Sequence, residues 1–365
     1  MTKREQFINY VKQGGEKPIA SPQIGAGAGF DAKLAGKKSA SMQDTVNAAE
    51  LFDMLPLYNY GLDFSALSPL LKWTPQGQRS EGHLRVEISG IKTPYGDLIS
   101  ETAMNNEGDS YRTKAPVTCR EDFDKFNWYL DTLLEGDYGE ARRQGSEADR
   151  FIGGRGAIDF QWGMQPYELF SMSGTLDTVL LAMDYAEDFI KLMDKCAAIS
   201  KKIIDALAPY TDFVFLGGPA AEMVSPDIYD NFMVPYGKMM TDYAHSKGLL
   251  IYSHVCSPIE PFLTMGYFNR LGIDLFETLS MPPVGNVKSI EDAFSKLDPA
   301  ICTRGNIGID TLMNETPDEI KRQVNHIMEA AVKMKRKHMV AASDYLLAEC
   351  KKENVQALCD AVREF

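Results

Sequence analysis

The sequence has no long apolar run and no apolar leader at its start. No stretch approaches the roughly twenty consecutive apolar residues that a membrane-spanning helix requires. Residues 1–7, MTKREQF, are charged and lack the apolar core of a secretion signal. The sequence therefore predicts a protein of the cytoplasm that has no membrane partner.

Cysteine and positive charge are also scarce. The six cysteines are scattered over 365 residues, which argues against a disulfide framework and fits a reducing compartment. The net charge of −13 argues against nucleic acid as a partner, because phosphate contacts need lysine and arginine gathered on one face. The one basic cluster, Lys333–His338, ends an expected helix, where cations suit the helix dipole.

The second half of the chain alternates apolar strands with amphipathic helices. This alternation predicts a parallel α/β sheet, with strands expected at 211–216, 273–278, 300–304 and 338–343 and a further strand that follows Gly248 and ends at His254. An open doubly wound sheet and a closed barrel share this local pattern. A (β/α)8 TIM barrel is favoured, because polar candidates end consecutive strands and only a closed sheet gathers many strand ends around one centre.

The first half is expected to extend this barrel within a single domain, residues 1–365. Residues 1–150 are assigned to an N-terminal extension, and alternating residues from about 80 to 105 predict a β-hairpin or meander inserted on the main fold. The glycines of residues 25–29, GAGAG, do not form a dinucleotide motif, since the last required glycine falls at Phe30. We expect a loop over the pocket there.

His254 and Cys256 follow an apolar run and are two residues apart. Side chains in a strand alternate between its faces, so the two point the same way and can reach one ion or one substrate. Ser257 and Glu260 are spaced as a capping box that would start a helix directly afterwards. A buried, purely structural role for both residues is the competing interpretation.

The chain from about Gly156 onward resembles the uroporphyrinogen decarboxylase superfamily, and within it the corrinoid-dependent methyltransferases. The resemblance rests on the order of several short motifs, which are residues 215–218, 223–226, 235–236, 252–256, 305–307, 316–319 and 353–355. It implies a barrel that moves a methyl group between a small molecule and the cobalt of a corrinoid on a separate protein. No stretch here resembles a corrinoid-carrying domain, so the corrinoid must arrive on a partner.

The resemblance also implies a zinc site built from a His-x-Cys pair and a later cysteine. The later position is Ser343 in this chain, and a hydroxyl is a far poorer zinc ligand than a thiolate. Either Glu277, Cys302 or Glu222 completes a site with His254 and Cys256, or no metal binds. His254, Glu222 and Glu277 are the candidates for proton transfer or charge stabilisation. The candidates for substrate binding are Tyr252, Trp162, Trp128 and Tyr95.

These residues predict transfer of a methyl group from a small methoxylated or N-methylated substrate to Co(I). Three alternatives stay open: methyl transfer from a corrinoid to a thiol, decarboxylation, and a non-catalytic barrel that only binds a corrinoid protein. Tetrapyrrole decarboxylation is disfavoured, because residues 22–34 contain no arginine where the decarboxylases are arginine-rich. The sequence leaves open whether a second copy of the chain is a further partner.

Overall fold

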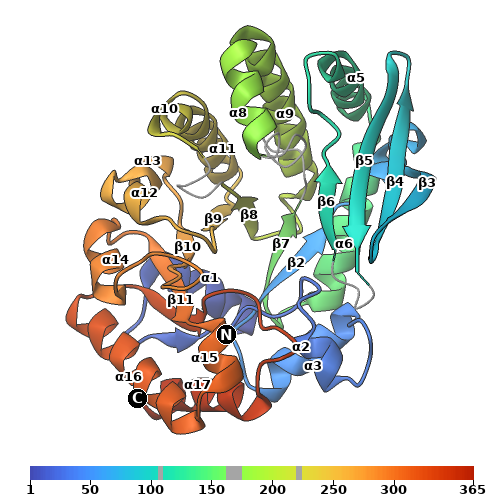
Figure 1. Cartoon of the computed structure of the whole chain (residues 1–365). Helices are drawn as coiled ribbons and strands as arrows, with labels where there is room; N and C mark the ends of the chain where they lie inside the picture. Colours follow the sequence, from blue (N-terminus) through green and yellow to red (C-terminus); the bar gives the residue numbers. More distant parts are fainter. Residues whose placement is uncertain (106–109, 162–174, 219–223) are drawn as a thin grey trace.

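The chain folds as an α/β barrel with a separate antiparallel sheet beside it (Figure 1). The computed structural model describes residues 1–105, 110–161, 175–218 and 224–365. The barrel sheet has eight parallel strands in the spatial order β1 (Ile19–Ala20), β12 (His338–Ala342), β11 (Cys302–Ile307), β10 (Leu275–Thr278), β9 (Leu250–His254), β8 (Phe213–Leu216), β7 (Ala157–Gln161) and β2 (Leu57–Gly61). The expected fold class is confirmed.

The two edge strands, β1 and β2, meet where the curled sheet comes round on itself. The amide of Leu55, just before β2, donates to the carbonyl of Ala20 at 3.1 Å. The hydroxyl of Ser21 donates to the carbonyl of Leu55 at 2.6 Å. These bonds join the edges without a regular ladder, so the strand ends surround one interior, as the sequence predicts.

Helices connect the strands and cover the outside of the barrel (Figure 1). They are α1 (Lys3–Gln13), α2 (Phe30–Leu34), α3 (Met42–Leu51), α4 (Phe64–Leu67), η1 (Pro69–Leu71), α5 (Asp122–Leu134), α6 (Tyr138–Ile152), α8 (Thr175–Asp184), α9 (Ala186–Leu207), α10 (Pro226–Ile228), η3 (Tyr229–Met233), α11 (Val234–Ser246), α12 (Glu260–Thr264), α13 (Tyr267–Leu271), α14 (Ile290–Lys296), α15 (Ile309–Asn314), α16 (Pro317–Lys333) and α17 (Lys352–Glu364). Among the described residues, no helix combines the length and apolarity that a membrane crossing needs.

Hydroxyl side chains begin several of these helices. Ser225, Ser289 and Thr316 each accept a backbone N–H of the first turn, as N-cap residues do. The capping box expected at Ser257 is wrong. Helix α12 begins at Glu260, and Ile259 is its N-cap residue. The backbone N–H groups of both residues donate to Oδ1 of Asn286 instead of to Ser257.

Helix α1 closes the amino-terminal end of the barrel. Its apolar face carries Phe7, Tyr10 and Val11 into a cluster with the inward-facing residues of the strands. Phe7 meets Phe213 edge to face, with ring centroids 5.5 Å apart. Because this end is filled by side chains, a ligand must approach from the carboxyl-terminal end of the strands.

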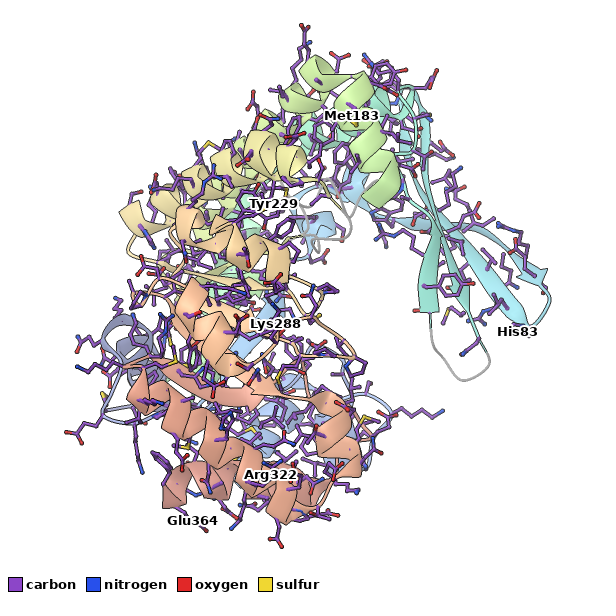
Figure 2. The ribbon with its side chains drawn as sticks, turned by 60° about the vertical axis from the view of Figure 1, so that its left-hand side comes forward. His83, Met183, Tyr229, Lys288, Arg322 and Glu364 are labelled. Carbon is purple, nitrogen blue, oxygen red and sulfur yellow. The ribbon has the colours of Figure 1, made fainter. Side chains whose placement is uncertain are left out.

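The insertion between β2 and β7 forms a four-stranded antiparallel sheet. Its strands are β3 (Thr74–Glu81), β4 (Leu84–Thr93), β5 (Gly96–Met104) and β6 (Ser110–Lys114). The expected hairpin between β4 and β5 is confirmed, with Thr93 paired to Gly96 across a two-residue turn. Figure 2 shows His83, in the β3–β4 turn, at the end of this sheet that projects away from the barrel.

Candidate metal centre at the mouth of the barrel

Three polar side chains lie side by side because of the register of three neighbouring strands. Glu277 on β10 pairs with His254 on β9 and with Arg304 on β11. Residues at matching positions of adjacent strands point to the same face. The register therefore places an imidazole, a carboxylate and a guanidinium in one layer.

Glu277 is bound on both sides in this layer. Its carboxylate lies 3.1 Å from Nδ1 of His254 and accepts a 2.6 Å hydrogen bond from Nη1 of Arg304. Burial raises the pKa of Glu277, but the charges and hydrogen bonds of Arg304 and His254 outweigh it and lower the pKa below the ordinary value. Glu277 is thus ionised and holds one nitrogen of the His254 ring.

His254 is also one of three possible metal ligands that lie close together. His254, Cys256 and Asp344 each offer one ligand atom, and these atoms all lie within 4.8 Å of one another. Nε2 of His254 is 3.6 Å from a carboxylate oxygen of Asp344. All three residues are partly exposed, so the cluster opens to solvent at the carboxyl-terminal end of the strands.

The electrostatics of His254 reflect its anionic neighbours. Burial lowers the pKa of His254, but the side chains of Cys256 and Glu277 outweigh it and raise the pKa to about 10. The same acidic neighbours would attract a metal cation, which has to displace the proton of His254 in order to bind it. One imidazole nitrogen, one sulfur and one carboxylate oxygen are donors that zinc takes in proteins, and a fourth position would remain for water or substrate. The donor set therefore fits zinc.

Asp344 is the residue that the sequence interpretation missed. It directly follows Ser343, the position at which the family resemblance implies a third zinc ligand. Ser343 is buried and borders a different cavity. Asp344 lies two residues after the end of β12, just as Cys256 lies two residues after the end of β9. This equivalent position after a strand could have identified Asp344 as a candidate ligand from the sequence.

Two of the expected metal ligands are not members of this cluster. Glu277 is outside the three-residue cluster, because its two oxygens are engaged by His254 and Arg304. Cys302 is fully buried at the amino-terminal side, where it packs with Leu275 and Met339. Burial also raises the pKa of Cys302, to about 12, which disfavours the thiolate that a metal needs.

The expected substrate residues are not brought together. Tyr252 is fully buried one layer below His254. Trp128 is partly buried on α5 and packs against the hydrophobic core, and Tyr95 is exposed in the β4–β5 turn. The three do not lie together, and their part in substrate binding stays a prediction. Trp162 and Glu222 lie outside the described residues.

A second polar network lies in the interior beside Tyr252. The carboxylate of Asp159 accepts hydrogen bonds from the hydroxyl of Tyr252 at 2.8 Å and from the amide of Asn59 at 3.1 Å. The amide oxygen of Asn59 accepts a 2.7 Å bond from the hydroxyl of Tyr345. The ring of Tyr345 lies against that of His254, with centroids 5.8 Å apart, so the network reaches the metal cluster.

The environment of Asp159 disfavours the charged form of its carboxyl group. It is completely buried, and burial raises its pKa to about 7 although Tyr252 and Asn59 lower it. Among the described residues, no hydrogen-bond donor reaches its Oδ1 atom. No pattern around Asp159 in the sequence indicated this role, since its partners come from β2, β9 and the segment after β12.

Comparison with solved structures supports the same fold. A structure described as a methyltransferase from Methanosarcina mazei superposes with a TM-score of 0.64, covering 100% of this chain and 99% of that chain at 14% identity. At that identity, the likeness shows the fold alone. The 3-keto-D-glucoside 4-epimerase YcjR from E. coli reaches a TM-score of only 0.40, with 11% identity over 70% of this chain and 97% of that chain, and supports no argument.

Sequence comparison with whole curated proteins and with family models gives different results. No curated protein matches the chain. The family model described as uroporphyrinogen decarboxylase (URO-D) matches residues 167–365, which is more than half of the chain. The match includes β8 to β12 and therefore the whole candidate metal centre. The chain belongs to the uroporphyrinogen decarboxylase family.

Proposed function

We propose that this protein is a corrinoid-dependent methyltransferase with a zinc site at His254, Cys256 and Asp344. It would move a methyl group from a small methoxylated or N-methylated compound to Co(I) of a corrinoid on a separate protein. The observation that carries the proposal is the convergence of three metal-ligating side chains, within 4.8 Å, at the open end of the barrel. The similarity to a methyltransferase structure agrees with it but rests on the fold.

The chemistry requires a group that stabilises the charge left behind when a methyl group departs. Zinc bound there would act as a Lewis acid on the oxygen from which the methyl group of an ether leaves, whereas a quaternary amine would leave as a neutral molecule without help from a metal. Co(I) is a strong nucleophile, so the task of the protein is to position the methyl donor and to stabilise its leaving group.

Glu277 and Arg304 prepare His254 for this task. Glu277 would accept a hydrogen bond from Nδ1–H of His254, so that Nε2, which lies 3.6 Å from Asp344, would be free to bind zinc once the metal displaces its proton. Arg304 balances the charge of Glu277 and also donates to the carbonyls of Ser21 and Pro22 at 2.6 and 3.2 Å. The ligand layer is thereby tied to the segment that follows β1.

The partly exposed position of the cluster suits a reaction with a second protein. Cobalt on a partner must come within bonding distance of the methyl group, so the methyl donor must lie at an open surface. The side chain of Asp344 is 37% exposed, whereas that of His254 is 14% exposed. The substrate is therefore expected to enter past Asp344, on the side where the corrinoid protein would dock.

The test is to mix the protein with a Co(I) corrinoid protein and a panel of aryl methyl ethers and methylamines, and to record ultraviolet-visible spectra. We expect one donor class to convert Co(I) to methyl-Co(III). Cys256→Ser should slow this conversion by about 10- to 100-fold or more. Cys119→Ser, which changes an exposed cysteine, is the matched control and should keep full activity. Conversion by no donor, or equal rates for both variants, would contradict the proposal.

A further inference from the structure

The possible metal ligands come from two strand ends that are not neighbours in the barrel sheet. His254 ends β9, and Asp344 follows β12, with β10 and β11 between the two strands. The ladder places each strand against its neighbour, but β12 ends before Asp344 is reached. A metal site binds tightly only when the surrounding residues hold its ligands in place. The position of Asp344 therefore depends on contacts beyond the ladder.

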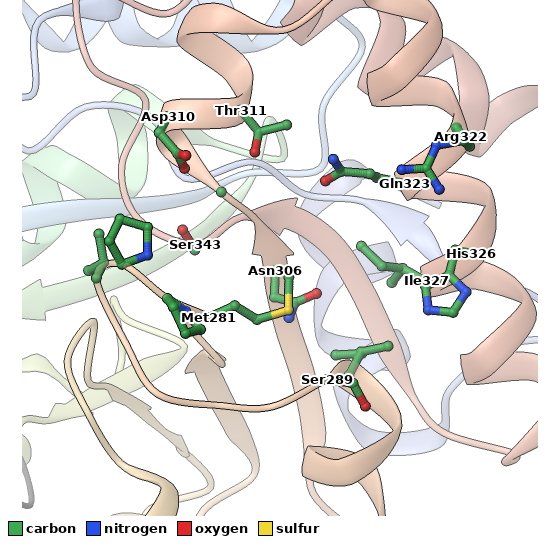
Figure 3. A pocket seen from close by; sticks show the side chains of 15 residues that line it. Met281, Ser289, Asn306, Asp310, Thr311, Arg322, Gln323, His326, Ile327 and Ser343 are labelled. Atoms are coloured by element: carbon green, nitrogen blue, oxygen red, sulfur yellow. The ribbon is translucent and has the colours of Figure 1, made fainter.

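The backbone around Asp344 is bound on both sides. The amide of Ser343 donates to the carbonyl of the last residue of β11 at 2.7 Å, and the amide of Leu346 donates to the segment after β1 at 2.9 Å. Figure 3 shows Ser343 in the wall of a cavity that none of the three possible ligands lines. Between these anchors, the amide of Tyr345 donates to Oδ1 of Asp344 at 2.7 Å. The Asp344 carboxylate is thus tied to Tyr345.

Tyr345 is held in turn by Asn59 on β2. The hydroxyl of Tyr345 donates to Oδ1 of Asn59 at 2.7 Å, while its ring lies beside that of His254. Strand β12 borders β1 at one edge of the sheet, and β2 forms the other edge. The bond therefore crosses the seam at which the barrel closes.

The amide nitrogen of Asn59 is bound to the strand that carries His254. It donates to the hydroxyl of Tyr252 at 3.0 Å and to the carboxylate of Asp159 at 3.1 Å. Tyr252 also accepts from Gln161 at 2.9 Å and donates to Asp159, so its hydroxyl is held on several sides. A carboxylate oxygen only accepts, so Asn59 cannot exchange its two amide atoms without losing the bond to Asp159. Tyr252 and His254 are two residues apart on β9 and share a face.

We propose that Asn59 is a positioning residue for the metal centre, a role that rests on the proposed zinc site. Its oxygen holds Tyr345, the residue after Asp344. Its nitrogen holds Tyr252, on the strand of His254. The two amide atoms thus join the segment that supplies one ligand to the strand that supplies the other, and they fix the separation of the ligands.

Zinc affinity and the visible spectrum of the Co(II)-substituted full chain test this role. Asn59→Leu keeps the size of the side chain and removes both amide atoms. We expect zinc affinity, measured by competition with a chromophoric chelator, to fall about tenfold. The d–d and sulfur-to-cobalt bands should shift, because the ligands move relative to one another. Asn354→Leu makes the same change at a buried asparagine of α17 that donates to two backbone carbonyls, and both readouts should stay unchanged.

A second variant separates this role from a general loss of packing. Tyr345→Phe removes only the hydroxyl and keeps the ring beside His254, and it should weaken zinc binding by about the same factor as Asn59→Leu. The two changes combined should bind zinc no more weakly than Asn59→Leu alone, because both break one connection. Tyr345→Phe decides the matter if Asn59→Leu fails to fold.

Three results would count against the role. Additive losses in the double variant would overturn it, and so would zinc affinity and a Co(II) spectrum that stay unaltered in Asn59→Leu or, if that variant does not fold, in Tyr345→Phe. In both cases the zinc site itself would stand. An unaltered protein that binds neither metal would contradict the zinc site and this role together.

Discussion

Glu277 and Arg304 form an ion pair that is almost fully removed from water, with side chains 1% and 2% exposed. Each charge is tolerated in the interior only because the other is present. This pair supports the orientation of His254 and therefore links the stability of the barrel to the chemistry of its mouth.

Replacing Glu277 by glutamine should leave the buried charge of Arg304 unbalanced. We expect a loss of about 3–5 kcal/mol in the free energy of unfolding, measured by urea denaturation. Glu315→Gln changes an exposed glutamate and should cost less than about 0.5 kcal/mol. A loss below about 1 kcal/mol for Glu277→Gln would contradict the role assigned to the ion pair.

Asp344 and Ser343 give a direct comparison of two neighbouring candidates for the third zinc ligand. Asp344→Ala should weaken zinc binding by about 10- to 100-fold or more, because it removes a donor atom. Ser343→Ala should leave the affinity unchanged, since Ser343 lies outside the cluster. Both are measured by competition with a chromophoric chelator. A larger loss of zinc affinity in Ser343→Ala than in Asp344→Ala would show that Ser343 is the third ligand.

Asp159 should make the stability of the protein depend on pH. Its folded-state pKa is raised to about 7 by burial, above the ordinary value of 3.8. A raised carboxyl pKa contributes stability that is fully present below about pH 4 and is lost as the pH rises through about 7. Asp159→Asn should flatten this part of the profile in denaturation experiments from pH 4 to 8. An unchanged slope in the variant would show that Asp159 is not the titrating group.

Helix α1 is only 11 residues long, but it closes the amino-terminal end of the barrel. Phe7 is fully buried against Phe213, and the guanidinium of Arg304 lies 5.8 Å from the centre of the Phe7 ring. The helix therefore contacts the residue that anchors Glu277.

Phe7→Ala should cost about 3–5 kcal/mol of stability, as expected for a large aromatic ring removed from a core. Asn9→Ala, on the exposed side of the same helix, should change stability by less than about 0.5 kcal/mol. Thermal and urea unfolding of both variants measure the difference. Similar costs for the two would mean that α1 only lies on the surface.

The regular elements of the second half were predictable because their signals are local. Helix α9 and strand β9 follow from apolar spacing, and the start of α16 follows from Thr316 and Pro317. A π-helical turn, η3, lies between α10 and α11 directly before Pro235. The start of α12 was mispredicted, because Asn286, distant in the sequence, binds the amides that Ser257 was expected to cap.

The candidate site could be predicted only in part, because some of its residues come from segments that are far apart in the sequence. His254 and Cys256 share one strand end, and their spacing alone indicates a common target. Asp344 occupies the equivalent position after its own strand, but its meeting with His254 depends on how the barrel closes, and the support from Arg304 depends on strand register. Asp159 and Asn59 depend on the pairing of β2 with β7 across the long insertion.

For the whole molecule, closure of the barrel is the condition on which the metal centre depends. Strands β9 and β12 are not neighbours in the sheet, yet their ends supply His254, Cys256 and Asp344 to one point. An unfolded chain keeps two of the ligands near each other but loses the third. Zinc should therefore bind the folded protein preferentially and raise its unfolding temperature as the zinc concentration increases, with a logarithmic dependence.

Zinc K-edge X-ray absorption of the zinc-loaded protein tests the central claim most directly. The proposed centre predicts one zinc per chain, with a single sulfur at about 2.3 Å and the remaining ligands nitrogen or oxygen at about 2.0–2.2 Å. The sulfur signal should vanish in Cys256→Ser. A protein that retains no zinc, or a spectrum without sulfur, would contradict a metal centre built from His254, Cys256 and Asp344.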